Sequence, residues 1–249
     1  MDNLIDITYL KDLHKLNDDK EYYNGVGQKY LSNSNIGQLL KHPSLFQKSE
    51  GDNKNFMLGR YFHQLILEPH KAKDFPIIDV SSRTTKAYKE ACADGVMRML
   101  IKEAEEVKEW VNVIDNHKIF APLIYQPDNE FEVPAIGEIH GNLWKGKADI
   151  ITEDFVIDIK TSSDMFKFKR NSFFYNYDSQ AFVYQSLFNK PVKFLVVDKQ
   201  YKLLSWWDVP QEALEQGEEK VIQATEIYNK YHRHDSTEKI EEYYLEGSI

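Results

Sequence analysis

Cysteine is almost absent from this chain, with Cys92 the only one among 249 residues. A single thiol excludes an intrachain disulfide framework. It also excludes zinc or iron–sulfur sites built from several cysteines, so no iron–sulfur cluster is expected. Such sparing use of cysteine fits a reducing, cytosolic compartment.

Long apolar runs are also missing. No run approaches the roughly 20 apolar residues that a membrane-spanning helix needs. The first residues, MDNLIDITYL, lack the basic stretch and apolar block of a secretory signal peptide. We therefore expect a cytoplasmic protein without membrane contact.

Positive charge is in deficit, because 31 Lys and Arg residues face 40 Asp and Glu residues, for a net charge of −9. This balance argues against a protein whose whole surface coats DNA. The negative net charge still allows a local basic groove. A site rich in metal-binding carboxylates would contribute to that negative charge. Hydrophobic residues make up 42% of the chain, which is enough for a folded core.

The order of patterns predicts an α/β fold whose central mixed β-sheet is flanked by helices. Helical patterns cover 31–47, 55–69, 84–117, 177–189 and 210–232, while strand patterns cover 77–80, 130–160 and a hairpin at 192–209. Gly95 is a candidate break within 84–117. We expect an N-terminal arm or short helix at 1–30, one domain at 31–232 and a polar tail at 233–249.

Two charges interrupt an apolar strand in DFVIDIKTSSD, residues 154–164. If Glu153 and Asp154 form the turn of a hairpin, residue 150 pairs with 157, and Asp149 lies opposite Asp158. Opposed side chains are about 5 Å apart, so like charges there destabilise a sheet unless a cation lies between them. The period of two places Lys160 on the same face as Asp158.

Two carboxylates and a lysine at one point suit phosphodiester hydrolysis. A hard divalent cation prefers carboxylate oxygens, polarises a phosphate and lowers the pKa of a bound water. The lysine can stabilise developing charge or position the attacking water. The alternative is an ordinary exposed strand with polar residues at alternate positions.

This set of residues resembles the signature of the PD-(D/E)XK nuclease superfamily. The helix GRYFHQLILEP with His63, the Asp149 and Asp158-Ile159-Lys160 core, and the helix QAFVY with Gln180 and Tyr184 follow one another as in its RecB-type branch. Within that branch, LSNSNIGQLLKHPSLF followed by LGRYFHQLILEP is similar to the RecE-like (exonuclease VIII-like) exonucleases of phages and prophages. The resemblance spans roughly residues 31–190.

The resemblance implies a restriction-endonuclease-like core and an exonuclease that uses Mg²⁺ or Mn²⁺. It would digest linear double-stranded DNA from 5′ ends and leave 3′ single strands for an annealing recombinase. It implies a ring-shaped homo-oligomer and, for a phage protein, the bacterial cytoplasm. Asp149, Asp158, the carbonyl of Ile159 and His63 would be metal ligands, Lys160 would be catalytic, and Gln180 and Tyr184 would support the site.

The chain departs from the family pattern in two ways. Asp158 stands where the family often has Glu, and the interval from Asp149 to Asp158 is short, which implies a tight hairpin. An upstream acidic residue often completes such sites. Glu130, Glu132 and Glu138 compete for that position, with Glu132 preferred.

Several residues are candidates for DNA contacts, with a solvated surface as the alternative for each. They are Lys145, Lys147, Thr161, Lys167, Lys169 and Arg170, together with Arg83 and Lys86, which could meet a terminal phosphate. The run FFYNY at 173–177 offers aromatic faces to unpaired bases or to the core.

We expect a magnesium-dependent exonuclease acting on ends of double-stranded DNA in phage recombination. An endonuclease or a single-strand nuclease would use the same core residues. A non-catalytic DNA-binding or assembly module is the alternative from a different class.

Overall fold

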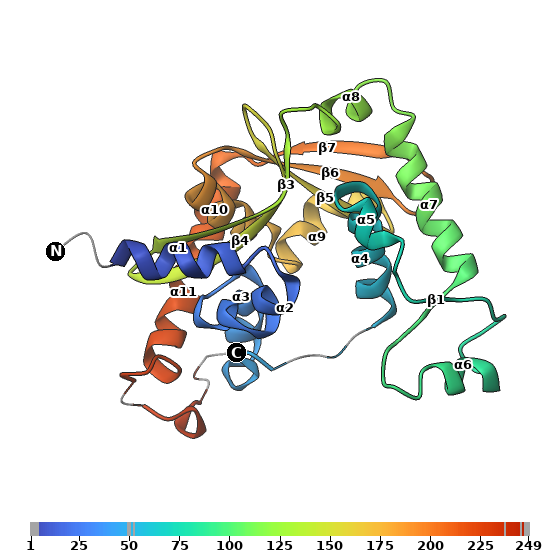
Figure 1. Cartoon of the computed structure of the whole chain (residues 1–249). Coiled ribbons are helices and arrows are strands. Elements are labelled where there is room, and N and C mark those ends of the chain that lie inside the picture. Colours follow the sequence, from blue (N-terminus) through green and yellow to red (C-terminus); the bar gives the residue numbers. More distant parts are fainter. Residues whose placement is uncertain (1–4, 49–50, 52, 237, 245, 247–249) are drawn as a thin grey trace.

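The computed structural model describes residues 5–48, 51, 53–236, 238–244 and 246. Its centre is a sheet in the order β3-β4-β5-β6-β7, formed by strands Glu130–Ile139, Asn142–Ile151, Val156–Ser162, Val192–Asp198 and Leu204–Asp208. Only β5 and β6 run parallel, and the other neighbours are antiparallel. The predicted α/β class with a mixed sheet is therefore confirmed (Figure 1).

The hairpin between β4 and β5 has the predicted register. Ile150 pairs with Ile157 and Ile151 with Val156. The turn closes where the backbone N–H of Thr152 donates to the carbonyl of Phe155 at 3.0 Å. Beyond Ile150 the two strands separate. The backbone N–H of Ile159 then donates to the side chain of Asp149 instead of to a backbone carbonyl of β4.

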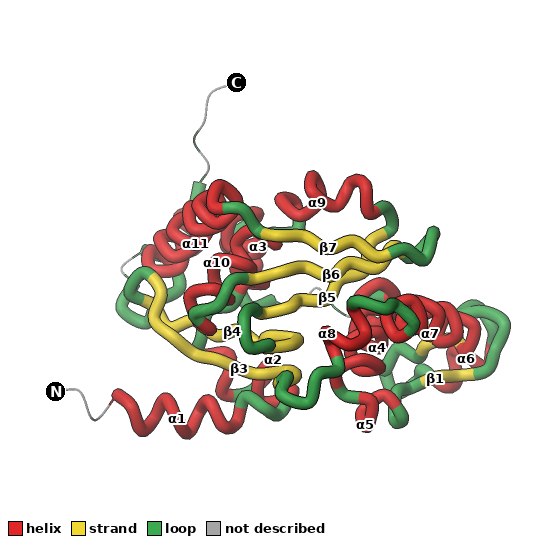
Figure 2. The backbone as a smooth tube through the Cα atoms, turned by 90° about the horizontal axis from the view of Figure 1, so that it is seen from above, coloured by secondary structure: helices red, strands yellow, loops and turns green. Residues whose placement is uncertain are grey.

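Helices on two sides of the sheet enclose separate apolar clusters (Figure 2). On one side, helices α4 (Lys54–Leu67) and α7 (Ile101–Asp115) cover residues such as Ile157 and Leu195. On the other, α3 (Asn33–Lys41), α10 (Tyr177–Phe188) and α11 (Gln211–Tyr231) cover residues such as Phe194. Among the described residues, no helix has the length and apolar character to cross a membrane.

Short helices complete the chain between these elements. They are α5 (Pro69–Ala72), α8 (Phe120–Ile124), α9 (Phe168–Phe174) and the 3₁₀ turns η2 (Pro43–Leu45), η3 (Met165–Lys167) and η4 (Ile240–Glu242). The parallel strands β5 and β6 need a crossover connection. Here η3, α9 and α10 form it, so α10 is held against the sheet beside the end of β5.

Gly217 lets α11 approach α10 closely. A Cβ at this position would lie 2.4 Å from the carbonyl oxygen of Asp178, a distance that no side chain tolerates. The buried Asp178 carboxylate is in turn paired with Lys220 at 2.8 Å. This contact fixes the position of α10 from the side that faces away from the sheet.

The N-terminal segment packs onto the domain rather than forming an arm apart from it. It contains α1 (Ile5–Lys15), α2 (Asp19–Asn24) and the 3₁₀ turn η1 (Val26–Lys29). Leu16, Tyr22 and Tyr30 are buried together with Ile136 of β3. Figure 2 shows α1 lying beside β3.

The stretch 84–117, predicted as helical, is only partly so. Helix α6 (Lys86–Ala91) ends at its C-cap Cys92, and Gly95, with a positive φ of 80°, lies in the turn that follows and divides the stretch as expected. Met99–Leu100 then forms a short strand, β2, in place of the predicted helix. It pairs in parallel with β1 (Ile77–Ile78), and of the two strands it is β2 that buries both of its side chains.

Glu103 connects this region to the core. Its buried carboxylate accepts two hydrogen bonds from the guanidinium of Arg83, at 2.5 and 2.7 Å, and one from the backbone N–H of Leu100 at 3.0 Å. Lys54 of α4 lies 3.2 Å away. Burial opposes the charge, yet these donors outweigh it and lower the pKa of Glu103 to about 2 from an ordinary value of 4.5.

We predict that Glu103→Gln lowers the free energy of unfolding by about 2 kcal/mol at pH 7, because a buried charge pair loses one partner. A depressed acid pKa stabilises the fold above pH 4.5, and this contribution is lost as the pH falls toward 2. The difference between wild type and variant should therefore shrink below pH 4.5. Urea denaturation at pH 7 and pH 3 measures it. The exposed Glu105→Gln on the same helix is the control, and an equal loss there would contradict the assignment.

Candidate active site

Five elements meet where β4 and β5 separate. Helix α4 supplies His63, β3 and β4 supply Glu132 and Asp149, and β5 and α10 supply the remaining groups around a groove of about 840 Å³. The candidates that act through side chains line it: His63, Glu132, Asp149, Asp158, Lys160, Thr161, Gln180 and Tyr184. Ile159 is fully buried and does not line the groove, so its carbonyl as a ligand stays a prediction. The structure thus brings together residues that lie far apart in the sequence.

Asp149 is the centre of the first cluster. Its Oδ2 accepts a hydrogen bond from the backbone N–H of Ile159 at 2.8 Å, and its Oδ1 lies 3.4 Å from Nδ1 of His63. One ligand atom each of His63, Glu132 and Asp149 lies within 4.8 Å of the others. Glu132 has a positive φ of 52°, which interrupts its pairing with Asp149 across the β3–β4 ladder.

The pKa values of these three side chains reflect the short distances between their charges. Burial, and next the charge of Asp149, raises the pKa of Glu132 to about 7. Burial opposes a charged His63, but the adjacent Asp149 carboxylate outweighs it and raises the pKa of His63. Burial likewise opposes the charge on Asp149, and the interaction with His63 outweighs it and lowers the pKa of Asp149. Proton binding at Glu132 and His63 therefore reduces the net negative charge of this cluster.

Asp158 and Lys160 form the second cluster. Nζ of Lys160 lies 2.5 Å from Oδ2 of Asp158, and Nε2 of Gln180 donates to Oδ1 at 2.7 Å. Burial raises the pKa of Asp158 to about 6, and the ammonium of Lys160 offsets only part of this effect. Burial would lower the pKa of Lys160, but Asp158 outweighs it and raises that pKa, so Lys160 is an ammonium at neutral pH.

Tyr184 contacts the backbone of β4 rather than the carboxylates of the site. Its hydroxyl donates to the backbone carbonyl of Lys147 at 2.8 Å. Gly146 permits this approach, because a Cβ there would lie 3.0 Å from the Tyr184 ring. Gln180 and Tyr184, one helical turn apart on α10, therefore tie β5 and β4 to the same helix.

The donor set fits a divalent cation. Ligands of one octahedral Mg²⁺ or Mn²⁺ lie roughly 3–4 Å apart, close to the spacing of the His63, Glu132 and Asp149 atoms. Two carboxylates suit both ions, and the imidazole nitrogen suits Mn²⁺ better. Binding would replace the proton that Glu132 otherwise retains. The oxygens of Asp158 are engaged by Lys160 and Gln180, so its part as a ligand stays a prediction.

A layer of ion pairs lies behind this set. Lys147 contacts Asp19 of α2 at 2.7 Å and Glu132 at 3.7 Å. Lys71 of α5 contacts the same Asp19 at 2.9 Å and Glu68 at 2.7 Å. Asp19 therefore joins the N-terminal segment to the sheet and to α5, the short helix that follows the one carrying His63.

The residues proposed for DNA contact divide into three groups. Thr161 and Lys147 line the groove, and Lys145 lines the neighbouring pocket. Arg83 is engaged by Glu103, and Lys86 pairs with Glu90 at 3.6 Å, and neither lines the groove. Lys167, Lys169 and Arg170 lie exposed on η3 and α9, where Lys167 contacts Asp164 at 2.6 Å.

Sequence reasoning missed much of the groove wall. Arg60 and Gln64 line it beside His63, at the i+3 and i+4 spacing of one helical face. That polar stripe on an otherwise apolar helix was a usable signal. Asp19 and Tyr23 also line the groove, and nothing in the local sequence around them indicates it.

The comparisons with known proteins agree with this geometry. Residues 29–242 match the family model described as a PDDEXK-like domain of unknown function (DUF3799). A comparison with curated proteins gives no match.

Two solved structures are similar in different degrees. The crystal structure of a "putative exonuclease" from Eubacterium rectale aligns with a TM-score of 0.61 and 17% identity, over 93% of this chain and 95% of that chain. At this identity the likeness shows the fold, and it confirms the restriction-endonuclease-like architecture together with the family match. The structure of SSO0001 aligns with a TM-score of only 0.35 and 14% identity, over 74% of this chain and 91% of that chain.

We predict that Glu132→Gln weakens Mn²⁺ binding at least tenfold, because it removes one anionic ligand. Without metal the variant should be no less stable than wild type, since it also removes a buried carboxylate beside Asp149. Thermal melts in Mn²⁺ and in EDTA measure both effects. Glu138→Gln, at an exposed position of the same strand, is the control. Equal Mn²⁺ stabilisation of all three proteins would exclude Glu132 as a ligand.

We predict that Mn²⁺ affinity falls roughly tenfold between pH 8 and pH 6. Glu132 has a pKa of about 7 and His63 a raised pKa, so protons increasingly occupy the ligands as the pH decreases through this range. Isothermal titration calorimetry at pH 6, 7 and 8 measures the affinity. An affinity independent of pH would show that the cation binds elsewhere.

Proposed function

Because the chain belongs to the family of PDDEXK-like domains, we propose that it is a divalent-cation-dependent deoxyribonuclease that digests linear double-stranded DNA from its ends. Family membership supports a nuclease in general. The observation that supports a nuclease in this particular chain is that one groove brings five side chains together. They are His63, Glu132, Asp149, Asp158 and Lys160. A structural role alone gives no reason to bury so many like charges together.

In this proposal, the role of each side chain follows from its charge. A cation bound by His63, Glu132 and Asp149 would polarise the scissile phosphate and lower the pKa of a bound water. Lys160 is an ammonium rather than a base, so it stabilises negative charge that develops on the phosphate. Asp158 and Gln180 hold Lys160 and the end of β5 in position.

The finer features of the proposal come from the resemblance to RecE-like enzymes. They are 5′-to-3′ digestion, Mg²⁺ as the usual cation, 3′ single strands passed to an annealing recombinase, a ring-shaped oligomer, and work in phage recombination in a bacterial cytoplasm. DNA contact outside the groove is assigned to Lys167 of η3 and to Lys169 and Arg170 of α9, all of which are exposed. We assign no DNA contact to Arg83, because Glu103 already engages its guanidinium.

We predict that wild type removes linear duplex DNA and leaves a matched closed circle intact, in Mg²⁺ or Mn²⁺ but not in EDTA. Gel electrophoresis of these two substrates, and of a single-stranded DNA beside them, measures this. Cutting of both forms would indicate an endonuclease, and loss of single-stranded DNA alone would indicate a single-strand nuclease. DNA binding without any cutting would favour a non-catalytic module.

We also predict that Lys160→Ala lowers the cleavage rate by a factor of about 100 or more, as for loss of a charge-stabilising donor. The control is Lys108→Ala, at an exposed position of α7. Circular dichroism confirms that both variants fold. Cleavage by Lys160→Ala at the wild-type rate would refute the site.

A further inference from the structure

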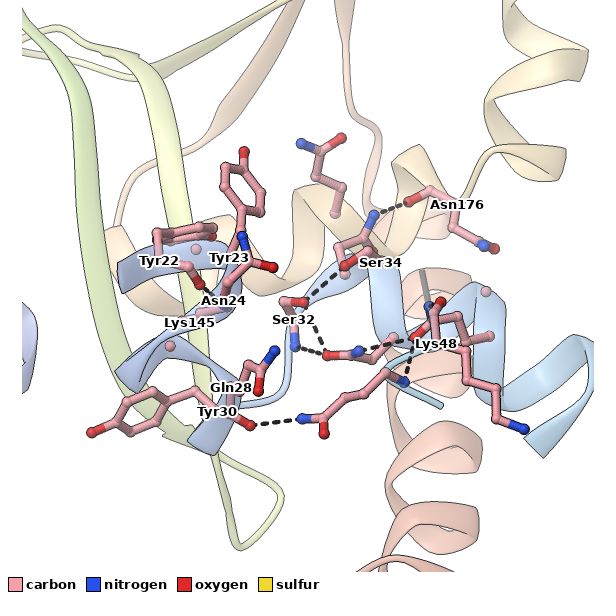
Figure 3. Close-up of a pocket in the computed structure, with 18 of the residues that line it drawn as sticks. Tyr22, Tyr23, Asn24, Gln28, Tyr30, Ser32, Ser34, Lys48, Lys145 and Asn176 are labelled. Carbon is pink, nitrogen blue, oxygen red and sulfur yellow. Dashed lines mark hydrogen bonds between the residues drawn. The ribbon is translucent and has the colours of Figure 1, made fainter. Parts of the chain in front are cut away.

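A second pocket of about 700 Å³ adjoins the catalytic groove and is not used by the chemistry proposed above (Figure 3). The two cavities share Tyr22, Tyr23, Asn24, Phe56, Gln180 and Tyr184 as a common boundary. Because Gln180 also contacts Asp158, the pocket begins one side chain away from the catalytic carboxylates.

The lining of this pocket is unusual for so acidic a chain. Among the described residues, none that lines it is acidic, although the chain has 40 Asp and Glu residues. The cations in this described lining are Lys48 and Lys145, while eight of its residues are Asn or Gln. Burial lowers the pKa of Lys145 to about 8, and this lysine donates to the backbone carbonyl of Tyr22. A pocket for phosphate would present more cations.

Hydrogen bonds hold the pocket floor in a fixed arrangement. Asn33 donates to the carbonyl of Asn176 at 3.1 Å and accepts from Ser179 at 2.7 Å. Asn35 donates to Gln38 at 3.1 Å, and Gln38 donates to the carbonyl of Lys48 at 3.0 Å. The site is therefore built before any ligand arrives, which lowers the entropic cost of binding.

The opposite wall of the pocket is formed by the N-terminal segment and carries polar side chains that can bind a ligand. Figure 3 shows Tyr23, Asn24 and Gln28 on one side of the pocket, with Ser34, Lys48 and Asn176 across from them. Within the part of the chain that the structure describes, the side-chain amides of Asn24 and Gln28 make no hydrogen bond. Both residues are exposed. These amides present donors and acceptors to a ligand.

Three aromatic rings stand exposed at the rim. Tyr23, Phe56 and Tyr175 are 63%, 58% and 63% exposed, and they come from α2, α4 and the loop before α10. Core packing does not account for rings so exposed. Ring faces beside free amides are the combination that receives nucleobases, which stack on aromatic side chains and form hydrogen bonds through their edges.

We propose that this pocket receives the unpaired base of a nucleotide next to the scissile phosphate, with Tyr175 as a stacking surface. The proposal rests on the nuclease function and adds that the substrate enters the site as a single strand. A volume of about 700 Å³ is within the usual range of roughly 300–1,000 Å³ for ligand pockets. It suits one or two nucleotides and is too small for a duplex. A duplex end must therefore fray before the groove can act on it.

The test measures binding of a fluorescent single-stranded oligonucleotide by anisotropy in EDTA, where no cation supports cleavage. Tyr175→Ala should weaken binding roughly tenfold, as for loss of one base-stacking ring. Phe174→Ala is the matched control, because Phe174 is 77% exposed on the neighbouring position and lines neither cavity. Phe56→Ala, on a different helix, should reproduce the effect of Tyr175→Ala.

An oligonucleotide with abasic sites separates base stacking from backbone contact. The difference between wild type and Tyr175→Ala should disappear with it, and a blunt hairpin duplex should bind more weakly than the single strand. Wild-type binding by Tyr175→Ala, an equal loss in Phe174→Ala, or an unchanged Tyr175 effect on the abasic strand would each overturn the proposal.

These outcomes are independent of the proposed function. If single strands bind through Tyr175 but Mg²⁺ supports no cleavage, the base pocket stands and the nuclease function falls. If DNA is cleaved and Tyr175 does not affect binding, the nuclease function stands and the base pocket falls.

Discussion

The structure depends on how it compensates three closely spaced carboxylates, two buried and one half-buried, where β4 and β5 separate. Glu132, Asp149 and Asp158 would repel one another, and burial raises the cost of each charge. Lys160 compensates Asp158, and His63 compensates Asp149. Glu132 keeps a raised pKa, which makes it the position where the site has most to gain from a cation.

The architecture follows from this constraint. Because the strands part after Ile150, side chains from both sides of the sheet can reach the same space. Helix α4 brings His63 from one side, and α10 brings Gln180 from the other. The parallel pairing of β5 with β6 requires the crossover that carries α10. A fully antiparallel sheet with tight turns would leave no helix at this point.

The sequence was most informative where contacts are local. The register of the β4–β5 hairpin and the placement of Asp158 and Lys160 on one face follow from a period of 2, whereas the role of His63 came from the family resemblance. The role of Arg83 could not be predicted, because its partner Glu103 is 20 positions away and both lie in ordinary charged sequence. The contribution of Asp19 was hidden for the same reason, since Lys147 lies 128 positions along the chain.

That long separation has a consequence for how the protein is made. The segment with Asp19 and Tyr23 is synthesised before its partner strand β4 and before the supporting helix α10. Contacts of such high sequence separation form late in folding. A nascent chain therefore has no assembled groove until residues near Gln180 are available.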